Sequence, residues 1–61
     1  MRKPLTYGSA SMHAKRNKNP VHWRERCWSL SEKPQAQFFE EKKEVFCEYL
    51  ENGKIKIEKI I

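Results

Sequence analysis

The 61-residue chain lacks the glycine and the long apolar runs that nucleotide-binding and membrane-spanning proteins need. Its two glycines, Gly8 and Gly53, lie forty-five positions apart, which excludes a glycine-rich phosphate-binding loop. No segment approaches the ~18 apolar residues of a membrane span. No apolar stretch follows the first basic residues, as it would in a secretory signal. We therefore expect a soluble, cytoplasmic protein that does not bind membranes.

Cysteine is also scarce. Cys27 and Cys47 form no C-x-x-C pair, and His13 and His22 form no H-x-x-x-H pair, whereas structural zinc sites usually use such pairs. With no secretory signal, two reduced and partly buried thiols are favoured over a disulfide. We expect neither a metal nor any other cofactor.

The chain offers no recognisable catalytic group. A protein of this length forms at most one domain, and its stability of roughly 3–9 kcal/mol leaves little to support a strained active site. The serines lie in no nucleophile motif. Cys27 with His22 is the one conceivable nucleophile and base, and a surface histidine near a buried thiol is the simpler interpretation. We expect a binding protein and not an enzyme, and no segment matches a known family motif.

Positive charge is concentrated in the first half of the chain. Residues 1–33 carry a net charge of +6 and contain no acid before Glu25, whereas residues 34–61 carry −1. Such a basic segment is attracted to nucleic acid, anionic lipid or an acidic protein surface. The alternatives are a solvated tail and, less well supported because no apolar stripe is present, a mitochondrial presequence.

The most regular segment predicts one long amphipathic helix at about 32–52. At 100° per residue, Phe39, Phe46 and Leu50 form one stripe, and the glutamates project from the opposite side. Ser31 before Pro34 suits a helix start, and Asn52-Gly53 suits a helix end. The alternative is a hairpin with a three-residue loop, Glu51-Asn52-Gly53, which would pair Tyr49 with Ile55 and Cys47 with Ile57.

Strand patterns flank this segment. Ile55 and Ile57 alternate with charged residues, which predicts a C-terminal strand at 54–61. At about 21–28, Val21, Trp23 and Cys27 share one face of a strand, and a helix opened by Asn19-Pro20 is the alternative. The predicted fold is therefore α+β, with a mobile basic arm at 1–19 and a single domain at 20–61. Two strands and one helix bury little, so dimerisation is expected to complete the core.

Aromatic and basic residues alternate just before the predicted helix. Aromatic rings stack on bases and arginines reach phosphates, so we expect a small nucleic-acid-associated accessory or regulatory protein, of the kind found among phage, plasmid or ribosome-associated gene products. The predicted contacts are Lys15, Arg16, Lys18, His22, Trp23, Arg24 and Arg26. The competing interpretation is that at least one of the two tryptophans packs in the core and that Arg24 and Arg26 pair with glutamates of the predicted helix. The alternative function is a protein-interaction module, an inhibitor, adaptor or assembly subunit, docking through the helix residues Phe38, Val45 and Tyr49.

Overall fold

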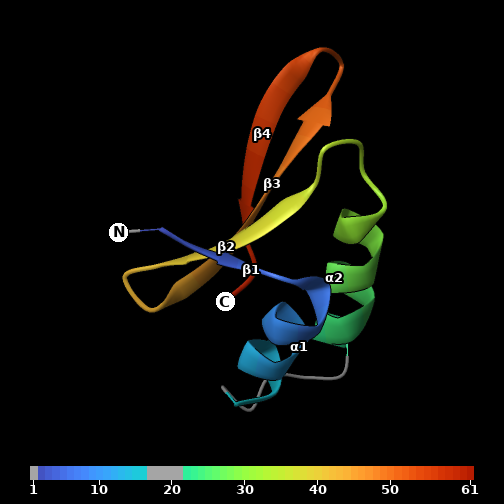
Figure 1. The fold of residues 1–61 in the computed structure, drawn as a ribbon. Helices are drawn as coiled ribbons and strands as arrows, with labels where there is room; N and C mark the ends of the chain where they lie inside the picture. The colour runs from blue at the N-terminus through green and yellow to red at the C-terminus, as the bar shows by residue number, and fades with distance from the viewer. Residues whose placement is uncertain (1, 17–21) are drawn as a thin grey trace.

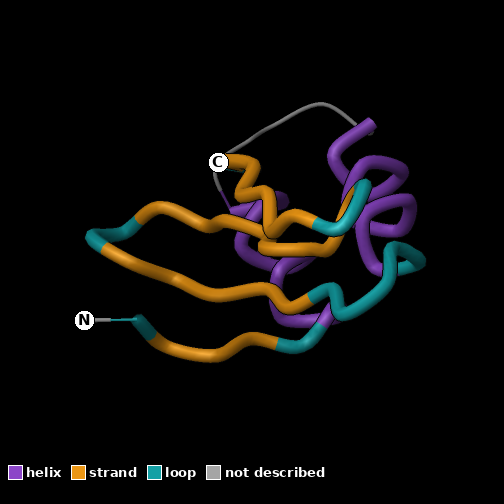
Figure 2. The backbone as a smooth tube through the Cα atoms, turned by 90° about the horizontal axis from the view of Figure 1, so that it is seen from above, coloured by secondary structure: helices purple, strands orange, loops and turns teal. Residues whose placement is uncertain are grey.

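The computed structural model describes residues 2–16 and 22–61 and has a mixed α+β fold (Figure 1). Two helices and four strands occur in the order β1 (Lys3–Leu5), α1 (Tyr7–Arg16), α2 (His22–Ser31), β2 (Gln37–Glu41), β3 (Glu44–Glu51) and β4 (Lys54–Lys59). The strands form one antiparallel sheet in chain order, and the two helices lie between β1 and β2 in the sequence (Figure 2). No helix in the described ranges is both long and apolar enough to cross a membrane.

One face of the sheet, here called the inner face, packs against the helices. Alternate residues of a strand point to opposite faces, and the registers place Phe38 beside Cys47. These two residues join the main core cluster, which also includes Val45 and Tyr49 of β3, Ala10 of α1, Cys27 and Leu30 of α2, and Ile60 after β4. The core therefore lies between the helical layer and the inner face (Figure 1).

The opposite face of the sheet, here called the outer face, carries a second and more exposed set of apolar residues. Phe39 stacks on Phe46 with ring centroids 5.3 Å apart, and the guanidinium of Arg2 lies 3.7 Å from the centre of the Phe39 ring. The same face holds Leu50, Ile55 and Ile57. Ile55 and Ile57 are more than half exposed, because no helix covers this side.

The predicted helix at 32–52 is wrong. This segment forms β2, a turn and β3, and Val45, Cys47 and Tyr49 alternate as buried residues along β3. Phenylalanine, valine and tyrosine favour strands, and pairing β2 with β3 buries residues on both faces, which one helix stripe cannot do. Lys42 and Lys43 form the connecting turn, both with positive φ.

The predicted strand at 21–28 is also wrong, because residues 22–31 form α2. Trp23, Cys27 and Leu30 follow the spacing of one helix face, and they pack together toward the core. Ser31, expected to start a helix, ends one instead, and its hydroxyl donates a hydrogen bond to the Trp28 carbonyl at 2.6 Å. Pro34 follows, consistent with its tendency to terminate the preceding helix.

The predicted C-terminal strand is confirmed over residues 54–59. The hairpin alternative has the correct topology and a register that differs by one residue. Leu50 pairs with Ile55 and Tyr49 with Lys56, around a two-residue Asn52-Gly53 turn. Within the expected basic arm, residues 3–5 form β1 and residues 7–16 form α1, so this part of the chain contributes to the fold.

Candidate nucleic-acid interface

The first helix is held close to the core by small residues. Thr6 caps it, since its hydroxyl accepts a hydrogen bond from the Ser9 amide at 3.3 Å and its carbonyl accepts one from Ala10 at 2.9 Å. Ala10 and Ala14, one turn apart, are buried. Small side chains at these positions let α1 approach its neighbours closely.

The second helix has one buried side and two exposed flanks. Trp23 packs against the core cluster, and Cys27 is fully buried. At 100° per residue, Arg24 and Trp28 lie on one flank, whereas His22 and Arg26 lie on the other. The helix therefore separates the basic residues that a strand would have presented together.

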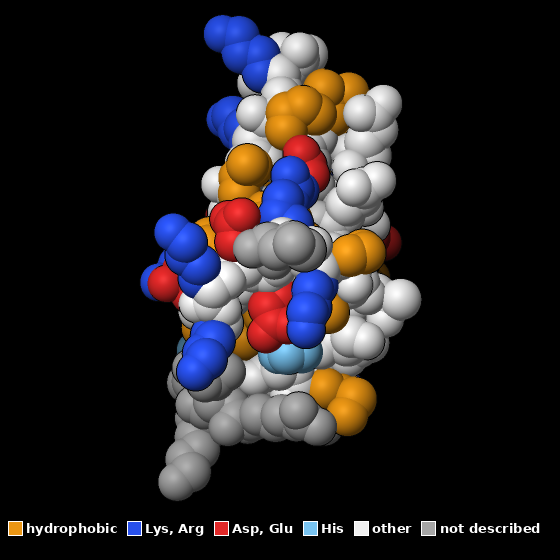
Figure 3. Space-filling model, turned by 60° about the vertical axis from the view of Figure 1, so that its left-hand side comes forward, with side chains coloured by type: hydrophobic (Ala, Val, Ile, Leu, Met, Phe, Trp, Pro, Cys, Tyr) orange, Lys and Arg blue, Asp and Glu red, His pale blue; other side chains and the backbone are white. Residues whose placement is uncertain are grey.

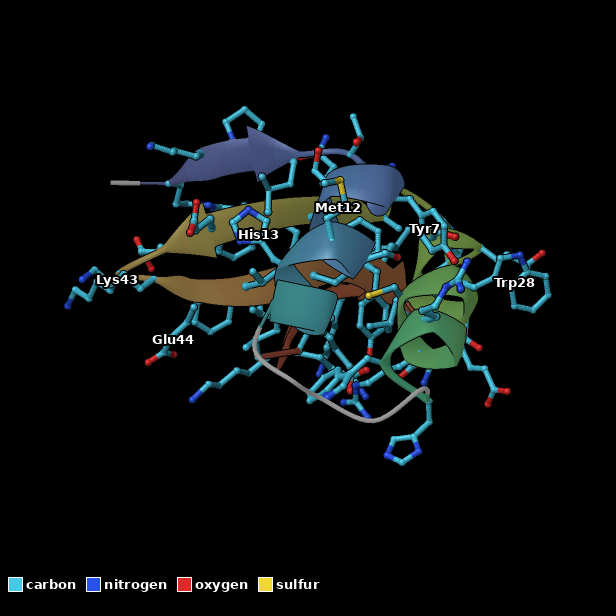
Figure 4. All side chains as sticks on the ribbon, turned by 90° about the horizontal axis from the view of Figure 1, so that it is seen from below. Tyr7, Met12, His13, Trp28, Lys43 and Glu44 are labelled. Carbon is cyan, nitrogen blue, oxygen red and sulfur yellow. The ribbon has the colours of Figure 1, made fainter. Side chains whose placement is uncertain are left out.

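Tyr7 joins the start of α1 to the Arg24 flank of α2. Its hydroxyl donates a hydrogen bond to the Arg24 carbonyl at 3.4 Å, and its ring lies 6.3 Å from the ring of Phe38. Trp28, one turn after Arg24, points outward from α2 and is 56% exposed (Figure 4). Two partly exposed aromatic rings thus lie close to one arginine.

Two hollows meet at Tyr7. The smaller, about 230 Å³, lies between α1 and α2 and is lined by Tyr7, Gly8, Ser11, Met12 and Arg24. The larger, about 590 Å³, lies mainly over β1 and β2, includes the paired side chains of Arg2 and Glu48 in its lining, and reaches α2 at Ser31. Tyr7 lines both hollows, so they adjoin at this residue and form a concave surface around it.

Most of the acids of the sheet are paired with cations. Arg2 pairs with Glu48, Arg26 with Glu58 at 2.6 Å, and Lys59 with Glu44 at 3.4 Å. Lys56 and Lys33 both approach Glu51, and their hydrogen bonds hold the pKa of Glu51 below its ordinary value. On the side seen in Figure 3, charged side chains separate the hydrophobic ones. Cations of the strands, of the flanking segments and of α2 therefore neutralise much of the negative charge of the sheet.

The helical layer is charged differently. The helical residues 7–16 and 22–31 contain four lysines and arginines and the single acid Glu25, a net charge of +3. Within the described ranges, Arg24 forms no salt bridge. The guanidinium of Arg24 thus accompanies the exposed rings of Tyr7 and Trp28 on the helical side of the molecule.

The seven predicted contacts have different outcomes. His22 and Arg24 are exposed on α2, Trp23 packs against the core, and Arg26 is exposed and paired with Glu58. Trp23 thus packs as the competing interpretation expected, and Arg26 pairs with a glutamate of β4, outside the segment 32–52. Lys15 and Arg16 lie in the last turn of α1, and Lys18 lies outside the described residues.

The predicted partner-binding residues do not form an exposed face. Phe38, Val45 and Tyr49 are 4%, 1% and 5% exposed and belong to the core. The helix stripe that grouped them does not exist, since all three point to the inner face of the sheet. The exposed apolar side chains of the sheet are instead those of Ile55 and Ile57.

Both cysteines are free and fully buried. Burial raises the pKa of Cys47 to about 11, and burial also raises the pKa of Cys27 against the opposing effects of the Ser11 hydroxyl and Arg26. Thiols with raised pKa values are poor nucleophiles at neutral pH. Among the described residues, His, Cys, Asp and Glu form no group of three or more that could hold a metal ion.

Comparisons with family models, with curated proteins and with solved structures found no match. The site is therefore defined by its geometry alone. Sequence reasoning missed Tyr7, which lay in the expected arm, and left Trp28 out of the predicted contacts. A helical interpretation of 22–31 would have grouped Trp28 with Arg24, because residues four positions apart lie on the same side of a helix.

Proposed function

We propose that this protein is a small nucleic-acid-associated accessory or regulatory protein that binds through the layer formed by α1 and α2. The observation that carries the proposal is the contrast between the two layers. Most glutamates of the sheet have a cation partner, whereas the two helices, residues 7–16 and 22–31, have a net charge of +3 and one acid. Arg24, which has no salt bridge within the described ranges, lies beside exposed aromatic rings, and this combination suits a polyanion that also presents flat apolar surfaces.

Binding by this layer is mainly electrostatic in the proposal. Lys15, Arg16, His22 and Arg24 supply the contacts to phosphates, and Arg26 contributes only if it leaves Glu58. Each neutralised phosphate releases counterions, so the affinity falls steeply as salt is added. The interface resides in the chain's own side chains and requires no cofactor.

We also propose that the protein binds and does not catalyse. The raised pKa values of the buried thiols support this view, because a thiol that stays protonated at neutral pH is a poor nucleophile and base. Two free buried thiols also suit a reducing compartment such as the cytoplasm.

An electrophoretic mobility shift with duplex DNA, duplex RNA and single strands at ~50 mM salt tests the proposal. We expect a shift at micromolar protein that is lost near ~300 mM salt. The double variant Lys15→Gln/Arg16→Gln should weaken binding. The matched control Lys54→Gln/Lys56→Gln, which removes the same charge from the edge of the sheet, should not. Absence of any shift for the parent protein would overturn the proposal.

A protein-interaction module remains the second candidate function, and it is relocated from the predicted helix to the outer face of the sheet. The favouring observation is that Ile55 and Ile57 are 52% and 56% exposed on one edge strand. A pull-down from cell extract with and without nuclease separates the candidates. A stoichiometric protein partner that survives nuclease and is lost with Ile55→Ser/Ile57→Ser supports this alternative. Sedimentation of the purified protein at rising concentration tests whether that partner is a second copy.

A further inference from the structure

The concave surface around Tyr7 deepens the proposed function, on which the following inference rests. We infer that this surface binds single-stranded nucleic acid, with a base stacked on Trp28, a phosphate at Arg24 and the neighbouring nucleotide against Tyr7. The site is called the Tyr7–Arg24–Trp28 site below. This site is a small part of the interface proposed for α1 and α2, because it depends on three particular side chains.

The first argument is the exposure of Trp28. Trp23 and Trp28 lie on the same helix, and only Trp23 packs against the core. The Trp28 ring points away from the sheet and is 56% exposed (Figure 4), so packing within the chain does not account for it. An exposed indole ring offers a base a large flat surface at little entropic cost.

The second argument is the placement of charge beside that ring. Arg24 precedes Trp28 by one helical turn, so both side chains leave the same flank of α2. Within the described ranges Arg24 has no carboxylate partner, in contrast to Arg26, which pairs with Glu58 at 2.6 Å. A guanidinium that is not neutralised within the chain remains available for a phosphate.

The third argument is that the Tyr7 ring is held in place. The hydrogen bond to the Arg24 carbonyl and the tilted contact with Phe38 fix both ends of this side chain, which is still 37% exposed. Tyr7 lines both hollows, of about 230 and 590 Å³, and Arg24 lines the smaller one. A nucleotide seated at Tyr7 and Arg24 therefore lies in a hollow, whereas Trp28 is outside the lining of both hollows and offers its exposed ring on the same flank of α2.

The aromatic rings favour a single strand over a duplex. A base in a duplex is covered on both faces by its neighbours, so an indole ring on a helix surface reaches a base face only where the strand is unpaired. Duplex binding would depend on the cations of the helical layer alone. A comparison of single-strand affinity with duplex affinity therefore tests whether Trp28 stacks on a base.

Fluorescence anisotropy of a labelled single-stranded 12-mer and of the matching duplex at ~50 mM salt measures this preference. We expect the parent protein to bind the single strand more tightly. Trp28→Ala should weaken single-strand binding by about 5- to 100-fold, the effect of losing one stacked base. Trp28→Phe, which keeps an aromatic ring, should restore most of the affinity. Ile57→Ala is the matched control, since Ile57 is equally exposed, 56%, on the outer face of the sheet.

Arg24→Gln and Lys54→Gln form a second matched pair, because each removes one exposed charge that has no salt bridge within the described ranges. Arg24→Gln should reduce the salt slope of single-strand binding by about 0.7, and Lys54→Gln should leave it unchanged. Addition of the unlabelled strand should also quench tryptophan emission in the parent. The quenching should disappear in Trp28→Phe, where Trp23 is the remaining tryptophan.

The outcomes separate this inference from the proposed function. If the parent binds nucleic acid while Trp28→Ala and Ile57→Ala bind alike and no quenching occurs, the inference is wrong and the electrostatic interface stands. If single strand and duplex bind equally and the Arg24 and Lys54 variants share one salt slope, the inference is likewise wrong. If the parent binds no nucleic acid at all, both are overturned.

Discussion

The backbone amide of Ile60 donates a hydrogen bond to the carbonyl oxygen of Val45 at 2.7 Å, and the Ile60 side chain is fully buried. Ile61 donates to the same oxygen at 3.3 Å. The chain thus turns inward directly after β4 and closes the core beside the start of β3. The last two residues therefore belong to the packed structure.

Replacement of Ile60 by alanine should be strongly destabilising. Removing a buried isoleucine side chain costs the free energy of burial and leaves a cavity, about 2–5 kcal/mol. Ile57→Ala removes the same atoms from an exposed site and should cost under about 1 kcal/mol. Urea unfolding followed by circular dichroism measures both. Equal losses in the two variants would contradict the placement of Ile60 in the core.

The two faces of the sheet should respond differently to loss of an aromatic ring. Phe38 lies in the core, so Phe38→Ala should lower the free energy of unfolding by about 3–5 kcal/mol. Phe46 is half-buried on the outer face, where it stacks on Phe39, so Phe46→Ala should cost about 1–2 kcal/mol. The long-helix prediction implies a large loss at Phe46, so denaturant titration of this pair distinguishes the two folds.

Replacing the glycine of one hairpin turn should destabilise the protein, and introducing a glycine into the other turn should stabilise it. Gly53 has a φ of 76°, so Gly53→Ala places a side chain in the left-handed region and should cost about 1–2 kcal/mol. Lys43 adopts a φ of 65° without being glycine. Lys43→Gly should relieve this strain and stabilise the protein by about 0.5–1 kcal/mol. Thermal melts of the two variants test this, and a destabilising Lys43→Gly would show that the β2–β3 turn has another conformation.

Stability should fall at alkaline pH. Cys47 has an ordinary pKa of 9.0 and a folded pKa of about 11, so between these values the unfolded chain loses a proton that the folded chain retains. The free energy of unfolding therefore decreases from about pH 9 to pH 11, by at most about 2–3 kcal/mol for this group. A hydrogen bond to Glu58 and burial raise the pKa of Tyr49 to about 12, which extends the decrease above pH 10. Urea midpoints at pH 8 and pH 10.5 measure the effect.

The Cys47→Ala variant serves as the control for this pH dependence. It should be less stable at neutral pH because a buried side chain is lost, and its stability should change less between pH 8 and pH 10.5. A pH dependence identical to that of the parent would show that Cys47 does not carry the linkage.

The sequence did not locate the helices. They occupy Tyr7–Arg16 and His22–Ser31, whereas the segment predicted as a helix at 32–52 contains two strands. Phe39, Phe46 and Leu50 satisfy a helical period, whereas Val45, Cys47 and Tyr49 satisfy a strand period. Local periodicity alone does not choose between them. Pairing between β2 and β3 decides, because it satisfies the backbone hydrogen bonds of both segments and buries Phe38 against Cys47.

The sequence by itself determined the features that depend on a single residue or a short pattern. These are the α+β class, the strand at 54–59, the excess charge of the first half and the two free thiols. Tertiary structure alone decided which side chains meet. Tyr7 reaches Arg24 only because two helices separated by five residues pack on one face of the sheet. Trp23 and Trp28 differ in burial for the same reason, since a helix has one side that contacts the core and the sheet determines which side that is.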